Sequence, residues 1–164
     1  MSLFGKNDPM IPRPTVEPTL GMKWHKFLIY FALWASAVVN LSSALQYLTG
    51  AIYGTDAAYV YAYYDGLSML DKGMGIFLLG MAIFAIVTRF ALAGFKAGAP
   101  KKLLAIYALN IVSGFAYILL ASMVTGFSVG ELLDTSVITS AITSVIILFY
   151  NKSYYEARKE MFVN

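Results

Sequence analysis

The sequence of 164 residues contains no cysteine and a single histidine, His25. Without cysteine the chain has no disulfide, no thiolate metal site, no iron–sulfur cluster and no cysteine nucleophile. A single histidine also excludes a bis-histidine haem and a two-histidine metal site within one chain. Since no other catalytic motif is present, we predict a protein that is not an enzyme and that has no cofactor and no metal site.

Charged residues are also scarce, at 13% of the chain, whereas apolar residues make up 59%. Soluble domains carry roughly 25% charged residues, so a water-soluble fold would lack polar residues to cover its surface. The composition therefore predicts an integral membrane protein whose main partner is the lipid bilayer. The basic residues flank apolar segments and form no stripe of the kind that follows phosphates, so no nucleic acid is expected to bind.

Four apolar segments predict four transmembrane helices, because about 20 helical residues cross the hydrocarbon core of a bilayer. The fold class is thus all-α, an integral membrane four-helix bundle over residues 23–151. The second segment is short between Lys72 and Arg89, so either Arg89 reaches toward the headgroups or the helix continues to Phe95. The predicted parts are a flexible proline-rich tail (1–22), helices at about 26–49, 70–95, 102–126 and 130–151, and an amphipathic extension (152–164).

The distribution of basic residues predicts the orientation. Eleven of the twelve Lys and Arg residues lie in the two terminal regions and in the loop between the second and third helices, and Lys72 is the exception. Positively charged flanks remain in the cytoplasm. We therefore expect a multi-pass protein with cytoplasmic N- and C-termini.

The two halves of the sequence share a spacing pattern. Lys26 precedes Gly50 and Gly54 at the same intervals at which Lys102 precedes Gly126 and Gly130, and the Leu-Asp pair ending at Asp71 recurs ending at Asp134. One interpretation is a duplicated helical hairpin. The other is that basic flanks and turn glycines recur in any helical hairpin.

The predicted outer loop after the first helix is rich in tyrosine. Its candidate recognition residues are Tyr53, Asp56, Tyr59, Tyr61, Tyr63, Tyr64 and Asp65. Amphipathic rings settle at the membrane interface, so the loop is either an aromatic belt or a short re-entrant helix. The functional alternative is a surface that recognises a partner or an amphiphile, with the aspartates attracting a cation.

Two carboxylates, Asp71 and Asp134, are predicted at the outer starts of the second and fourth helices. A carboxylate there caps the helix and interacts favourably with its dipole. Ser128 and Glu131 have the spacing of a capping box, and Ser68 and Asp71 imitate that spacing. The alternative is that Asp71 and Asp134 line an outer vestibule for a cation.

Small and polar residues recur at helical spacing inside the apolar segments. The predicted packing positions are Asn40, Gly80, Asn110, Gly114, Ser136, Ser140 and Ser144, and the stripes on the first and third helices also include Tyr47 and Tyr117. Such residues allow close approach and hydrogen bonds between membrane helices. A polar permeation path is the alternative, although no ionisable residue falls at the predicted bilayer centre.

The string KWHKFLIYFALW at residues 23–34 and the string TRFALAGFK at residues 88–96 resemble small, uncharacterised four-helix membrane proteins of Firmicutes, some of which carry an N-terminal zinc ribbon. The resemblance implies a bacterial cytoplasmic membrane and no particular function. This chain departs from the zinc-ribbon members because its tail has no cysteine.

These observations lead to three functional hypotheses. The first is a non-enzymatic membrane protein that acts through protein contacts, as an accessory or scaffold subunit of an assembly with other membrane proteins or as a homo-oligomer. The second is a small transporter or channel built as a duplicated hairpin, with Asp71 and Asp134 at its outer mouth. The third is a lipid-handling membrane protein that uses the aromatic loop.

Overall fold

The computed structural model describes residues 21–163, apart from the side chain of Ser136, and this part of the chain is all-helical. The elements are α1 (Lys23–Phe27), η1 (Leu28–Ala32), α2 (Leu33–Thr49), η2 (Ala51–Asp56), α3 (Ala57–Tyr63), α4 (Leu67–Ala93), α5 (Ala99–Thr125), α6 (Val129–Leu132), α7 (Thr135–Glu156) and η3 (Lys159–Met161). Most of the predicted N-terminal tail, residues 1–20, lies outside the described residues.

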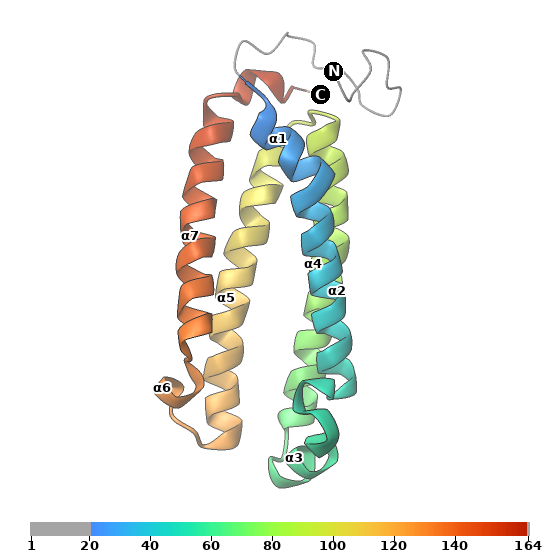
Figure 1. The fold of residues 1–164 in the computed structure, drawn as a ribbon, viewed down its shortest axis with the longest axis vertical. Helices are drawn as coiled ribbons and strands as arrows, with labels where there is room; N and C mark the ends of the chain where they lie inside the picture. The colour runs from blue at the N-terminus through green and yellow to red at the C-terminus, as the bar shows by residue number, and fades with distance from the viewer. Residues whose placement is uncertain (1–20, 164) are drawn as a thin grey trace.

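The long helices form two pairs, α2 beside α4 and α5 beside α7, and α4 also packs against α5 (Figure 1). The start of α1, the turn between α4 and α5 and the end of α7 lie together at one end of the molecule, which we call the basic end (Figure 1). The segments α3 and α6 lie at the opposite end, which we call the tyrosine end. The sequence predicted this up-and-down order of helices.

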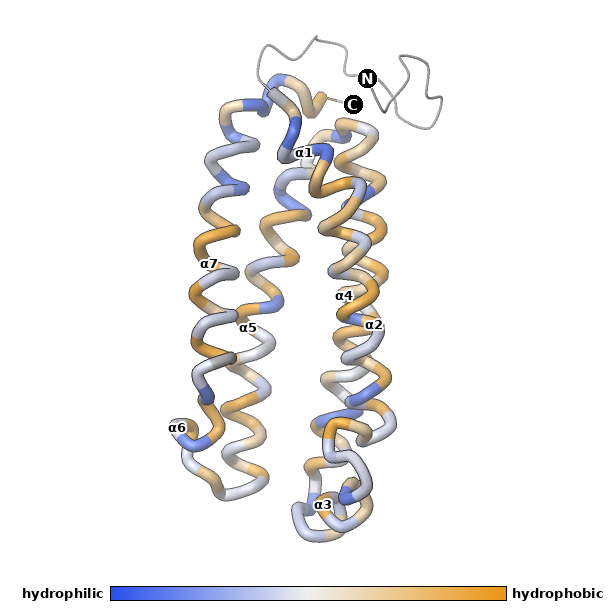
Figure 2. The backbone as a smooth tube through the Cα atoms, in the orientation of Figure 1, coloured by the Kyte–Doolittle hydropathy of each residue, from blue (hydrophilic) through white to orange (hydrophobic). Residues whose placement is uncertain are grey.

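Three helical stretches within the described residues are long and apolar enough to cross a membrane, namely Lys23–Tyr63, Leu67–Ala93 and Ala99–Thr125. Hydrophobic residues follow the middle of the long helices, and hydrophilic ones gather around α1 and the end of α7 (Figure 2). The predicted fourth span, now α7, is not among the three. Six of the first ten residues of α7 are serine or threonine.

The second and fourth helices begin at other residues than the sequence predicts. Gly66 has a left-handed backbone with φ of 87°, so α4 already begins at Leu67 instead of at residue 70. The predicted helix 130–151 is divided by Leu133 and Asp134, whose non-helical backbone separates the short α6 from α7. At its other end, α7 extends to Glu156, past the predicted end at residue 151.

Arg89 lies within α4, which continues to Ala93. Its Nε donates a hydrogen bond to the carbonyl oxygen of Ile29 at 3.1 Å, and its guanidinium lies 4.6 Å from the ring centroid of Phe90. Ile29 belongs to η1, a π-helical stretch inside the first long helix. A wider helical turn leaves carbonyl groups available to a neighbouring side chain. Arg89 therefore ties α4 to the first helix near the basic end.

The packing core lies between α2 and α4 and at the basic end, where Leu28, Leu92 and Leu103 are fully buried. α4 packs tightly against α2 at Gly75, where an added Cβ would lie 2.7 Å from the Leu48 side chain and 3.1 Å from the carbonyl oxygen of Ala44. At Gly80, a predicted packing position, a Cβ would meet no atom of this chain within 4 Å, and the same holds at Gly114. The small residue of α4 that lies tightly against α2 is thus Gly75, about one and a half helical turns before Gly80.

The end of α7 folds over α1 at the basic end. The indole N–H of Trp24 donates to Asn151 at 2.9 Å, and Nδ1 of His25 lies 3.0 Å from the Tyr155 hydroxyl. His25 is 2% exposed and stacks on Phe95. The sequence predicted interfacial anchors here, whereas His25 is part of the core.

Candidate functional site

Asp71 is fully buried, with 0% of its surface exposed, although it lies in an apolar helix. It is the fifth residue of α4, so the predicted capping role of Asp71 is wrong. Its carboxylate accepts a hydrogen bond from Tyr61 of α3 at 2.9 Å and another from Tyr117 of α5 at 2.7 Å. Three segments of the chain therefore converge on one carboxylate.

The backbone at Gly50 brings Tyr61 into this position. Gly50 ends α2 with φ of 77°, a left-handed conformation that favours glycine. The Tyr61 ring packs directly against it, since a Cβ at Gly50 would lie 2.8 Å from that ring. The chain can therefore reverse and lay α3 back over the start of α4.

A cavity of about 490 Å³ opens beside Asp71 between the two helix pairs. Its tyrosine lining consists of Tyr47, Tyr53, Tyr64 and Tyr117, and we call it the tyrosine chamber. The rings of Tyr47 and Tyr117 meet edge to face with centroids 5.3 Å apart. Tyr53 packs in the same way against Tyr61, at 5.5 Å. Asp71 itself lies behind these rings and does not line the cavity.

The hydrogen bonds to Asp71 decide what the tyrosine chamber can offer a ligand. An ionised carboxylate can only accept, so Tyr61 and Tyr117 each commit their single hydroxyl proton to Asp71. The oxygen of Tyr117 can then only accept toward the cavity, and its bond to a charged group strengthens it as an acceptor. Ring faces add attraction for cations. The site is therefore suited to a positively charged group.

The predicted recognition loop divides into two faces. Tyr53, Tyr61 and Tyr64 point inward, toward the chamber or Asp71. Tyr59 and Tyr63 are 72% and 68% exposed and stack on each other. Of the two loop aspartates, Asp56 is exposed before α3 and Asp65 is exposed in the turn after it. The loop thus contributes three tyrosines to the site and leaves two on the surface.

Asp134 does not share the environment of Asp71. Its side chain accepts from the backbone N–H of Val137 at 2.8 Å and caps α7, which confirms the predicted cap. The capping box of Ser128 and Glu131 is also confirmed, with bonds in both directions. Asp134 is exposed whereas Asp71 is buried, so the two predicted vestibule carboxylates serve different roles in this fold.

Several predicted packing residues line a second cavity of about 600 Å³ between α2, α5 and α7, which we call the hydroxyl groove. Its polar lining consists of Ser43, Tyr47, Asn110, Ser140 and Ser144, beside Gly114. Asn40 instead bonds within α2, to the carbonyl of Ser36 at 2.9 Å, and the Ser136 side chain lies outside the described residues. The hydroxyl groove shares Tyr47, Gly114 and Val137 with the tyrosine chamber, so the two cavities adjoin.

The sequence located most of the residues of this site but not their arrangement. Tyr47 and Tyr117 belonged to stripes predicted for helix packing, and their helical spacing was the available signal. Their role near Asp71 depends on a contact between residues 71 and 117, far apart in the chain. Across the described residues, no group of three or more His, Asp or Glu side chains is placed to hold a metal ion.

No family model matches the chain, and no curated protein or solved structure matches it either. The resemblance to small Firmicutes membrane proteins therefore stays a hypothesis based on residues 23–34 and 88–96.

Proposed function

We propose that this protein is a non-enzymatic, multi-pass membrane protein, a small transporter that binds a positively charged organic solute in the tyrosine chamber. The observation that carries the proposal is Asp71, a fully buried carboxylate in an apolar helix, held by two tyrosine hydroxyls. A charged group inside a membrane helix is costly, so proteins retain it mainly where it serves a ligand, an ion or a proton.

The proposal places four helices across a bacterial cytoplasmic membrane. Both α4 and α5 have 27 residues, and α7 has 22. At 1.5 Å per residue these lengths are about 40 Å and about 33 Å, enough to cross a hydrocarbon core of about 30 Å. The basic end would face the cytoplasm, in agreement with the distribution of Lys and Arg. The tyrosine chamber would then lie in the outer half of the bilayer.

A route for the solute is supported by the two adjoining cavities. The tyrosine chamber lies toward the tyrosine end, and the hydroxyl groove continues from it along α5 and α7 through shared lining residues. Serine, asparagine and tyrosine side chains can replace part of a solute's hydration shell. The polar permeation path, which the sequence offered as the alternative to helix packing, is therefore the role that we propose for these polar residues.

The test is uptake of tetraethylammonium, a permanently charged cation that lipid excludes, into proteoliposomes. Asp71→Asn should lower uptake by roughly tenfold or more, because removing a buried charge opposite a bound cation costs several kcal/mol. Asp134→Asn is the matched control and should leave uptake unchanged, since asparagine also caps helices well. Unchanged uptake in Asp71→Asn would refute the proposed site.

Assembly with other membrane proteins, or with a second copy, is the second candidate. The observation that favours it is the exposed hydroxyl face of α7, where Thr139, Ser140 and Thr143 lie at the surface. Hydroxyl groups in a membrane helix favour cross-helix hydrogen bonds. Replacing Ser140 and Ser144 by leucine should then change the size of the complex in native gels. Ile146→Leu, on an exposed apolar position of the same helix, is the control.

A further inference from the structure

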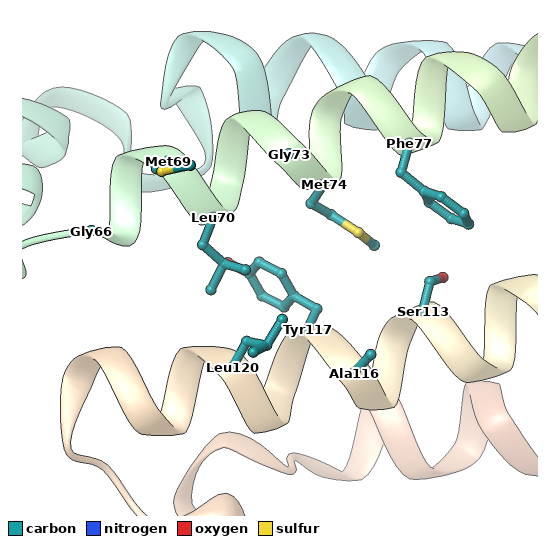
Figure 3. A pocket seen from close by; sticks show the side chains of 10 residues that line it. All are labelled: Gly66, Met69, Leu70, Gly73, Met74, Phe77, Ser113, Ala116, Tyr117 and Leu120. Atoms are coloured by element: carbon teal, nitrogen blue, oxygen red, sulfur yellow. The ribbon is translucent and has the colours of Figure 1, made fainter.

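A groove between α4 and α5 lies next to the tyrosine chamber, and among the described residues Tyr117 is the one tyrosine in its lining, whereas the chamber has four. Its volume is about 500 Å³, within the range of small-molecule sites. Figure 3 shows its lining, with Leu70, Met74 and Phe77 on α4 facing Ala116 and Leu120 on α5. We call it the lateral groove. Since nearly all of these side chains are apolar, it is suited to a hydrocarbon chain.

Tyr117 connects the lateral groove to the charge of Asp71. Tyr117 and Met74 line both the groove and the tyrosine chamber, so they form the wall between the two cavities. In Figure 3 the Tyr117 ring extends from α5 toward α4 beside Leu70. Its hydroxyl donates to Asp71 at 2.7 Å. An apolar groove thus ends at an oxygen that can only accept and that is bonded to a buried carboxylate.

We propose that the solute is a single-chain amphiphile with a cationic ammonium head, whose head lies against Tyr117 in the tyrosine chamber, with the carboxylate of Asp71 directly behind that ring, and whose tail lies in the lateral groove. This inference rests on the proposed function and names its substrate class. The apolar lining receives the tail and the carboxylate offsets the charge of the head, so the two cavities together match an amphiphile better than a small hydrophilic ion. A groove open between two lipid-facing helices also lets such a molecule enter from the bilayer.

Gly73 offers a way to block the tail without touching the head site. It lines the lateral groove, and no atom lies within 4 Å of a Cβ built on it, so a large side chain can enter the groove from this position. Gly80 is a matched control. It lies on the same helix with equally open surroundings and does not line the groove.

The experiment compares calorimetric binding of dodecyltrimethylammonium and ethyltrimethylammonium to the full chain in lipid nanodiscs, with empty nanodiscs subtracted. The parent protein should bind the dodecyl compound at least about tenfold more tightly, since each buried methylene adds about fourfold. Gly73→Phe should remove most of this preference and keep the affinity for the ethyl compound. Gly80→Phe should behave as the parent.

The outcomes separate the two proposals. If Gly73→Phe binds the dodecyl compound like the parent, the tail does not lie in the lateral groove, and the amphiphile is overturned while the cation site stands. If Asp71→Asn binds both compounds like the parent, the cation site itself is overturned. Ala116→Phe fills the same groove from α5 and replaces Gly73→Phe if that variant does not fold. Size-exclusion profiles establish which variants are folded.

Discussion

At the scale of single residues, Gly50 meets two requirements at once. Its φ of 77° is a conformation that side-chain-bearing residues rarely adopt, and the Tyr61 ring occupies the place of a side chain. Gly126 ends α5 with a similar φ of 79° and has open space around it. A substitution at Gly126 therefore tests backbone strain alone, whereas one at Gly50 tests backbone strain together with the steric contact to Tyr61.

We expect Gly50→Ala to destabilise the protein more than Gly126→Ala. Both variants bear the left-handed strain of about 1–2 kcal/mol, and only Gly50→Ala also displaces Tyr61 from Asp71. Unfolding of each variant by titration with dodecyl sulfate, followed by circular dichroism, gives the difference in free energy. Equal losses would mean that the contact between Gly50 and Tyr61 does not contribute.

Tyr117 contributes a second test at the same scale. In Tyr117→Phe the buried carboxylate of Asp71 keeps the bond from Tyr61 and loses the shorter bond. A buried polar group that loses a partner costs about 1–3 kcal/mol, and we expect the free energy of unfolding to fall by that amount. Tyr63→Phe, on the exposed side of the same loop, serves as the control because its hydroxyl lies at the surface. If Tyr63→Phe lowered the free energy of unfolding as much as Tyr117→Phe, the loss could not be assigned to the bond with Asp71.

At the scale of elements, the sequence predicted helices more reliably than their starting residues. Long apolar runs and turn glycines identify α2, α4 and α5, because lipid-crossing length and helix-ending glycines are local properties. The start of α4 was missed because Gly66, not Ser68 or Asp71, sets it. That shift of three residues carries Asp71 from the predicted helix end into the first full turns of α4, where it is buried. A small error in a boundary thus changed the predicted chemistry of the site.

The short α6 is an element whose stability should depend on pH. The hydroxyl and the backbone N–H of Ser128 both lie 2.7 Å from Glu131, and these bonds lower the pKa of Glu131 from its ordinary value of 4.5. Because the pKa in the folded state is below that of the unfolded state, the capping contribution is present above the ordinary pKa. It is lost as the pH falls through the lowered pKa.

We therefore expect hydrogen-exchange protection of the Ser128 amide to be constant near neutral pH and to fall under acidic conditions. Nuclear magnetic resonance in detergent micelles measures it residue by residue. Glu131→Gln is the control, and its protection should be weaker at neutral pH and independent of pH, because the amide does not titrate. Protection of the parent that stays constant through the acidic range would contradict the role of the carboxylate.

At the scale of the whole molecule, the two halves agree at some positions and differ at others. Gly50 and Gly126, equivalent in the proposed duplication, both end a long helix with a left-handed backbone. The equivalent carboxylates differ, since Asp71 is buried among tyrosines and Asp134 caps α7. Sequence spacing compares residues along the chain, whereas the burial of Asp71 depends on α3, which supplies Tyr61. The second half has only the shorter α6 in the corresponding place. The duplication remains a hypothesis, and the proposed site is asymmetric: its tyrosines come from the first half and α5, whereas the described residues of α6 and α7 add only the apolar Leu132 and Val137.

The last prediction concerns how the whole molecule crosses the membrane, and the lack of native cysteine makes it simple to test. Single cysteines can be placed at Thr55, in η2 just before α3, and at Gly130 in α6, both at the tyrosine end. At the basic end they can be placed at Ala97, between α4 and α5, and at Val163, after η3, and all four positions are exposed. A maleimide that does not cross membranes should label the first two in intact cells. The other two should react only after permeabilisation, because basic flanks remain in the cytoplasm. Labelling of Val163 together with Gly130 in intact cells would mean that α7 does not span the bilayer, and the hydroxyl groove would then open to water and not to lipid.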